Sequence, residues 1–78
     1  MDWRAYIYSD PNILVGKPVV KGIRLSVEFL LGLFAAGWTK EQALDNYPKL
    51  TPEALQAVFA YATESVQHES LFSVPTQD

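Results

Sequence analysis

The most constraining feature of the sequence is a pair of helix starts separated by a short turn within residues 38–62. Thr39, with Gln42 three residues later, forms the capping-box pattern of a helix N-terminus. Thr51 followed by Pro52 marks a second start, since threonine is a good N-cap and proline is favoured at the first helical position. The pattern predicts helices over residues 40–47 and 52–69. Two helices joined by so short a turn cross steeply, as in a helix-turn-helix.

An earlier helix is predicted over residues 27–36. Ser26 is a favoured N-cap residue, and Gly37 is the residue type that most often follows the last turn of a helix. Apolar residues occupy nearly every side of this segment, so we expect it to be buried on nearly every side. A chain of 78 residues can hardly cover such a helix alone. This predicts a homodimer that meets through the first helix and the strands.

The first 25 residues are predicted to form a small β element. Tyr6-Ile7-Tyr8 is a β-prone triplet stopped by a turn cluster. Val19-Val20 and Ile23–Leu25 flank Lys21-Gly22, a tight-hairpin pattern in which Gly22 supplies the positive φ. The predicted fold class is therefore mainly α, a three-helix, helix-turn-helix-like bundle with a short N-terminal β-hairpin element. It forms one domain over residues 1–72, followed by a disordered tail over residues 73–78.

Composition argues against metal, cofactor and enzyme chemistry. The chain has no cysteine and one histidine, His68. Glu64 lies one helical turn before His68, a pair that could ligate a metal or hold a proton, but no third ligand or nucleophile accompanies it. We interpret the pair as an ordinary solvated helix end, so no cofactor and no catalytic residue are expected. A small metal-binding or hydrolytic domain is the remote alternative.

No membrane segment is expected. The longest apolar run, residues 29–36, is far shorter than the roughly 20 residues that a spanning helix needs. The chain also lacks a basic-then-apolar signal peptide at its start. We therefore expect a cytoplasmic protein.

The charge is divided unevenly along the chain. All 6 basic residues lie in the first 49 positions, which carry a net charge of +1, whereas residues 50–78 carry −4. The predicted third helix has no cation and would present Glu53 to phosphate, so it does not fit a recognition helix. Lys17, Lys21 and Arg24 gather on the predicted hairpin, where a two-fold dimer could place them on DNA as a β-ribbon. The alternative is an ordinary solvated edge whose lysines discourage aggregation.

The C-terminal region carries apolar residues beyond the expected core stripe, which indicates a protein contact. The predicted partner-binding residues are Val66, Leu71 and Phe72. Two alternatives remain open: the arm folds back over its own domain, or it adds a strand to a neighbouring sheet.

An ordered series of short motifs resembles the prokaryotic family known as domain of unknown function 433. These motifs are Asp10-Pro11, Gly16-Lys17-Pro18-Val19, Gly22-Ile23-Arg24-Leu25-Ser26-Val27, Ala36-Gly37-Trp38-Thr39, Tyr47-Pro48-Lys49-Leu50-Thr51 and Ala60-Tyr61-Ala62. The family usually has threonine at the position of Ile23. The resemblance implies a helix-turn-helix-like domain, often dimeric, and a role as a VapB-type antitoxin of a toxin resembling PIN-domain ribonucleases.

The leading hypothesis is therefore a type II antitoxin. Its C-terminal region would neutralise a PIN-like ribonuclease toxin, and Lys17, Lys21 and Arg24 would bind operator DNA and repress its own operon. The alternative is a homodimeric protein-interaction module that never binds nucleic acid, which the absence of cations from the third helix favours.

Overall fold

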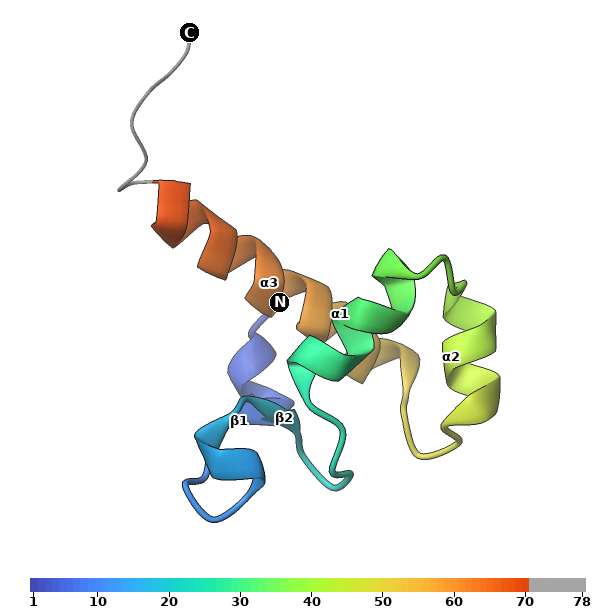
Figure 1. The fold of residues 1–78 in the computed structure, drawn as a ribbon, viewed down its shortest axis with the longest axis horizontal. Coiled ribbons are helices and arrows are strands. Elements are labelled where there is room, and N and C mark those ends of the chain that lie inside the picture. The colour runs from blue at the N-terminus through green and yellow to red at the C-terminus, as the bar shows by residue number, and fades with distance from the viewer. Residues whose placement is uncertain (71–78) are drawn as a thin grey trace, which may run out of the picture.

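The computed structural model describes residues 1–70 and confirms the mainly α prediction (Figure 1). Its elements are the 3₁₀ turns η1 (Trp3–Ala5) and η2 (Leu14–Gly16), the strands β1 (Ile7–Tyr8) and β2 (Val19–Val20), and the helices α1 (Val27–Ala35), α2 (Lys40–Asn46) and α3 (Pro52–Ser70). Each helix begins and ends within one residue of its predicted bounds. The predicted tail over residues 73–78, and the predicted partner-binding residues Leu71 and Phe72, lie outside the described residues.

The three helix starts are capped by the residues that the sequence indicated. Ser26 Oγ accepts a hydrogen bond from the Phe29 N–H at 2.9 Å. Thr39 forms the complete capping box, with one bond of 3.1 Å to its Oγ1 and a return bond of 2.8 Å from its N–H to the Gln42 side chain. The Thr51 hydroxyl likewise accepts from the Ala54 N–H at 3.1 Å. Each cap satisfies an otherwise orphaned backbone donor, which fixes where the helix begins.

Gly37 ends α1 and redirects the chain into α2. Its φ of +98° is open to glycine at low cost. The Gly37 N–H donates to the Phe34 carbonyl at 3.0 Å, and the Trp38 N–H donates to the Leu33 carbonyl at 3.0 Å. This pair of bonds is the Schellman motif, which satisfies the last free carbonyls of a helix while reversing the chain.

The first half of α3 forms the floor of the core, and α1 lies against it (Figure 1). Leu30 of α1 and Leu55 and Val58 of α3 are almost completely buried. The other buried apolar residues come from both strands, α1, α2, α3 and the segment between α2 and α3: Ile7, Val19, Val20, Val27, Ala43, Leu50, Ala54 and Ala57. The second half of α3 extends past this core, so Val66 is 61% exposed.

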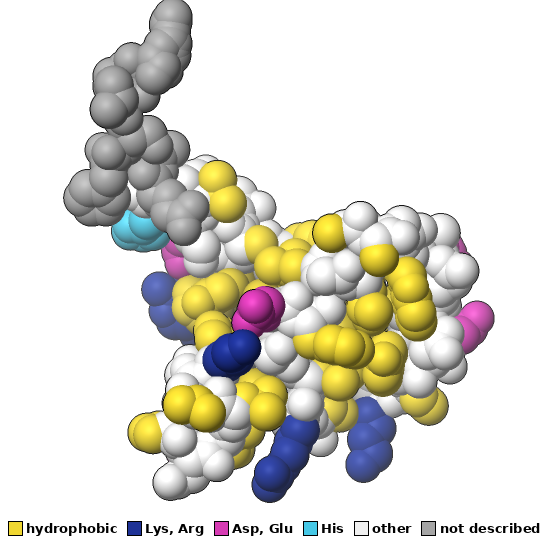
Figure 2. Space-filling model, viewed as in Figure 1, with side chains coloured by type: hydrophobic (Ala, Val, Ile, Leu, Met, Phe, Trp, Pro, Cys, Tyr) yellow, Lys and Arg dark blue, Asp and Glu magenta, His cyan; other side chains and the backbone are white. Residues whose placement is uncertain are grey.

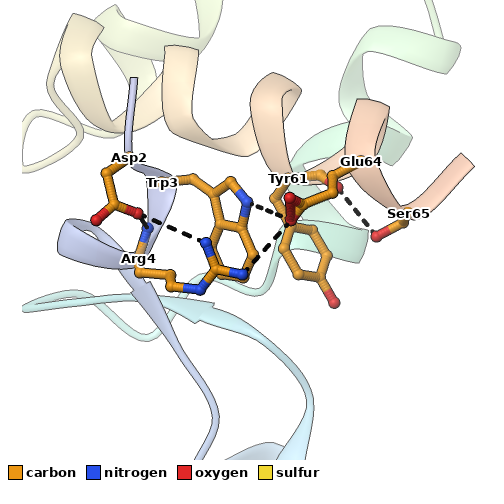
Figure 3. Close-up of polar contacts among 6 residues, drawn as sticks. All are labelled: Asp2, Trp3, Arg4, Tyr61, Glu64 and Ser65. Atoms are coloured by element: carbon orange, nitrogen blue, oxygen red, sulfur yellow. Dashed lines mark hydrogen bonds and ion pairs between the residues drawn. The ribbon is translucent and has the colours of Figure 1, made fainter. Parts of the chain in front are cut away.

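The N-terminus is fastened to the second half of α3 by a contact that the sequence analysis did not predict (Figure 3). Trp3 Nε1 donates a hydrogen bond of 2.9 Å to Glu64 Oε1, and the Trp3 ring meets Tyr61 edge-on at a centroid distance of 4.8 Å. The Arg4 guanidinium lies 4.5 Å from the Trp3 ring centroid. Edge-on aromatic and cation–π contacts of this kind add to the apolar burial of the ring.

The β element differs in its pairing from the predicted hairpin. The chain does reverse over Lys21-Gly22, and Gly22 has a φ of +83° as expected. However, β2 forms its ladder with β1, in the antiparallel register Ile7 with Val20 and Tyr8 with Val19. The expected second arm forms two backbone hydrogen bonds with Val20: the Ile23 N–H donates to the Val20 carbonyl at 3.3 Å, and the Val20 N–H donates to the Leu25 carbonyl at 3.0 Å. The pairing with this arm ends at an isolated bridge between Val19 and Ser26. It stops there because Ser26 caps α1, so the chain turns helical at the next residue.

The turn η2 holds two bulky residues in the left-handed region. Leu14 and Val15 have φ values of +50° and +57°, and Gly16 follows at +81°. A left-handed backbone costs a non-glycine residue roughly 1–2 kcal/mol, and a β-branched residue there is a genuine outlier. Val15 is 93% exposed and Leu14 is 45% exposed, so little packing offsets this strain.

We expect Val15→Gly to raise the free energy of unfolding by about 0.5–1 kcal/mol, because glycine tolerates a positive φ and the valine side chain packs on nothing. Urea denaturation measures this change. Val15→Ala is the matched control, since it removes the side chain but retains the Cβ that causes the strain. Equal stabilities of the two variants would contradict the strained backbone.

Candidate nucleic-acid interface

The 6 basic residues separate into paired and unpaired groups. Arg4 lies 3.8 Å from carboxylate oxygens of both Asp2 and Glu64, and Lys17 Nζ lies 2.8 Å from Glu28 Oε1. The remaining four form no ion pair with any carboxylate among residues 1–68: Lys21, Arg24, Lys40 and Lys49. The positive charge that is free to meet a ligand therefore belongs to this second group.

Arg24 and Lys49 line one hollow of about 640 Å³. Two segments form it, the loop Gly22–Leu25 before α1 and the turn 46–49 that leads from α2 toward α3. The steep crossing of the last two helices returns Lys49 to the loop that carries Arg24. Lys and Arg side chains project from the lower edge of the molecule in Figure 2, with hydrophobic surface above them.

The lining of this hollow combines cations with apolar side chains. Ile23, Leu25, Tyr47 and Pro48 supply the apolar part. At the rim, the Asn46 side-chain amide donates to the Gln42 carbonyl at 2.8 Å, which fixes the orientation of that amide. Lys21 precedes Gly22 in the same loop and is exposed. We call Lys21, Arg24 and Lys49 the cationic edge; three unneutralised charges of one sign attract phosphate despite a net charge of −3.

The structure brings together two of the three predicted nucleic-acid residues. Lys21 and Arg24 lie in one loop, whereas Lys17 is held by Glu28, although both partners of that pair are largely exposed. Lys49 was missed, because its nearness to Arg24 depends on the crossing angle of the helices. The helix-turn-helix turn itself was the one available signal, since it places Lys49 at the corner between α2 and α3.

The second predicted surface lies on the projecting half of α3. Val66 lines a mostly apolar hollow of about 320 Å³ with Phe59, Ala62, Thr63 and Gln67. Phe59 also meets Phe34 of α1 edge-on at a centroid distance of 5.1 Å, so this hollow continues toward the core. We call it the α3 hollow. Its residues lie about 10–22 Å along the helix from Pro52, at 1.5 Å per residue, which separates the hollow from the cationic edge.

The Glu64–His68 pair is not assembled as a metal site. Glu64 Oε1 already accepts the Trp3 indole hydrogen bond and lies near Arg4. Within the described part of the chain, no three histidine, cysteine, aspartate or glutamate residues come together in a way that would hold a metal ion. A search of the same residues finds no helix with the length and apolar character of a membrane span.

A comparison with protein families matches residues 7–62 to the family described as protein of unknown function, DUF433. The chain is 37% identical over 59 residues to an uncharacterized protein of Sinorhizobium fredii, y4eO. That alignment covers 76% of this chain but only 27% of the S. fredii protein.

Among solved structures, the chain resembles the crystal structure of a DUF433 member protein from Anabaena variabilis ATCC 29413. The TM-score is 0.74 at 27% sequence identity, and the match covers 80% of this chain and 61% of the Anabaena chain. The similarity therefore extends through the three-helix fold, while this chain spans less than two thirds of the length of either relative.

The Lys17–Glu28 pair generates a pH prediction. The hydrogen bond from Lys17 and the charge of its ammonium group hold the pKa of the Glu28 carboxyl below its ordinary value. The contribution of this pair to stability is therefore present above the ordinary pKa and is lost as the pH falls through the lowered one.

We expect Lys17→Met to raise the Glu28 titration midpoint measured by NMR, whereas Lys40→Met leaves it unchanged. A midpoint insensitive to Lys17 would contradict the pair.

Proposed function

This chain belongs to the DUF433 family, and from that premise we propose that it is a cytoplasmic antitoxin of a type II toxin–antitoxin pair, a binding protein rather than an enzyme. It neutralises a PIN-like ribonuclease toxin through the α3 hollow and binds operator DNA through the cationic edge. The observation that carries the proposal is the presence of two separate surfaces: a hollow that carries Arg24 and Lys49 on the segments 22–25 and 46–49, and the mostly apolar α3 hollow.

The DNA half of the proposal is supported by where the unpaired cations lie. Arg24 and Lys49 flank one open hollow, and Lys21 stands beside it. α3 itself presents Glu53 and Gln56 near its start and has no lysine or arginine, so it does not act as the phosphate-binding element. The loop and the helix-helix turn take that role. A two-fold dimer doubles the edge to six cations, which suits a palindromic operator.

The toxin half is supported by the exposed apolar surface on the projecting half of α3. Val66 is 61% exposed in a helix whose first half is buried, so the stripe of apolar residues continues beyond the core that it serves. Apolar side chains in a shallow hollow are typical anchors for a protein partner. The acidic balance of residues 50–78 complements a ribonuclease whose active site attracts RNA phosphate.

We expect the double variant Arg24→Gln/Lys49→Gln to bind a duplex from upstream of its own gene at least tenfold more weakly. The slope of log affinity against log salt should fall by about 2 per protomer, since each phosphate contact contributes about 0.9. Fluorescence anisotropy at several salt concentrations measures both.

The matched control is Lys40→Gln, which removes an unpaired cation at the start of α2. Lys17→Gln should lower the affinity for the duplex less than Arg24→Gln does, because Glu28 neutralises Lys17. An unchanged salt slope in the double variant would remove the DNA half.

We expect Val66→Asp to abolish co-purification of the toxin, because it buries a charge in an apolar contact. The measurement is a pull-down of the tagged chain from its native cells, with identification of the co-purifying protein. Ala36→Asp is the control, which adds the same charge at an exposed residue after α1 that does not line the α3 hollow. A toxin retained equally by both variants would place the contact elsewhere.

The second candidate is a homodimeric interaction module without nucleic-acid binding, which the lack of any cation in α3 favours. Half-buried apolar residues of α1 and the exposed Phe29 supply a surface for the second copy. Light scattering coupled to gel filtration, together with the salt titration, separates the two: a stable dimer that binds no duplex supports the module over the antitoxin.

A further inference from the structure

The exposed end of η2, formed by Leu14 and Val15, is the one place among residues 1–70 where bulky side chains occupy a left-handed backbone. We call these two residues the apolar tip. Val15 is the most exposed large apolar residue in the described chain, and Leu14 is nearly half exposed. The conformation is unfavourable for both residue types, and at Val15 almost no packing within the described chain offsets the cost. A contact with another molecule would offset the free-energy cost of this backbone conformation.

The apolar tip is held rigidly in spite of its exposure. The Gly16 N–H donates to the Ile13 carbonyl at 3.0 Å, and the Lys17 N–H donates to the Leu14 carbonyl at 3.1 Å. At the base of the loop, the Ile13 N–H donates to the Asp10 carbonyl at 2.9 Å. These bonds fix the direction in which the two side chains project, so a ligand meets them without a further ordering cost.

The loop that carries the apolar tip adjoins the cationic edge. Ile13, at the foot of the tip, lines one hollow together with Gly22, Ile23 and Arg24. In Figure 2, hydrophobic side chains at the lower left and basic side chains farther right lie along the same lower edge. The nearby acid, Asp10, is half-buried, and its carboxylate accepts a hydrogen bond from the Asn12 N–H at 2.9 Å. A ligand with a negatively charged surface therefore meets cations and the apolar tip together.

We propose that the apolar tip is a wedge that inserts between base pairs of the duplex held by the cationic edge and bends it. This inference rests on the DNA-binding role proposed above. Apolar side chains that enter a base step unstack it partly and kink the duplex, and the bend brings more phosphate onto basic protein surface. Pyrimidine–purine steps, TA above all, kink most easily, so they are the sites that the wedge selects.

The rival occupant is an apolar pocket on a protein partner. The cations beside the tip favour DNA, because Arg24 and Lys21 would need acidic partners to enter a protein interface without loss. The α3 hollow, on the second half of α3, already supplies an apolar surface for a protein. The observations therefore favour the duplex.

The test uses the full chain and two 24-bp duplexes from upstream of its gene, one with TA steps and one with AA steps in their place. The variant Leu14→Asn/Val15→Gly removes the wedge with residues that tolerate a positive φ, so the fold is retained. Anisotropy measures affinity, and energy transfer between dyes on the duplex ends measures bending. Ala36→Ser, at an exposed apolar residue after α1, is the control.

We expect the natural chain and Ala36→Ser to bend the TA duplex and to prefer it about tenfold. The wedge variant should bend neither duplex and bind both alike. Its salt slope should fall by less than that of Arg24→Gln/Lys49→Gln, because it loses only the phosphate contacts that bending adds. A wedge variant that bends DNA and keeps the TA preference overturns the wedge and leaves the cationic edge standing. Loss of toxin co-purification by the wedge variant, with its DNA binding and bending intact, overturns it in favour of a protein pocket. Absence of salt-dependent binding by the natural chain overturns the wedge and the DNA role together.

Discussion

Burial of one face of the first half of α3 is the constraint on which the rest of the structure depends. Leu55 and Val58 lie against Leu30 of α1, and these residues are almost completely buried. The strands and η1 are too short to be stable alone, and they gain stability by packing on this helix. Its buried half thereby fixes both the loop that carries Arg24 and the turn that carries Lys49. Its second half extends past this core and is contacted by Trp3 of η1 at Tyr61 and Glu64.

Local and non-local signals explain what the sequence could predict. The caps at Ser26, Thr39 and Thr51 each depend on residues at most three positions away, so the helix bounds were predictable to within one residue. The hydrogen bond from Trp3 to Glu64 joins residues 61 positions apart, and no periodicity or motif reports it. The ladder between β1 and β2 was missed for a related reason. Several β-prone segments could pair with Val19-Val20, and the choice among them depends on where α1 begins, after Ser26.

The electrostatics of the candidate site depend on where the acids lie more than on net charge. Glu28 and Glu64 are each placed against a cation, Lys17 and Arg4, that would otherwise extend the basic surface. No carboxylate among residues 1–68 is placed within ion-pair distance of Arg24 or Lys49. An acidic chain can therefore present a basic edge, because Coulomb attraction over a few ångströms outweighs distant charge that salt screens. Sequence counts located Lys21 and Arg24 but could not show which cations were already neutralised.

Gly22 and Val15 show when a left-handed backbone can be predicted from the sequence and when it cannot. Both residues have a positive φ. Glycine commonly adopts a positive φ, so the turn at Gly22 was predictable. At Val15 the residue type contradicts the backbone, and no local rule indicates a left-handed turn. Natural sequences agree with their folds at most positions, so a disagreement that costs stability is expected where function requires it. Because Val15 is almost fully exposed, almost no packing within the described chain offsets this cost, and Ile13, the residue before η2, lines a hollow together with Arg24.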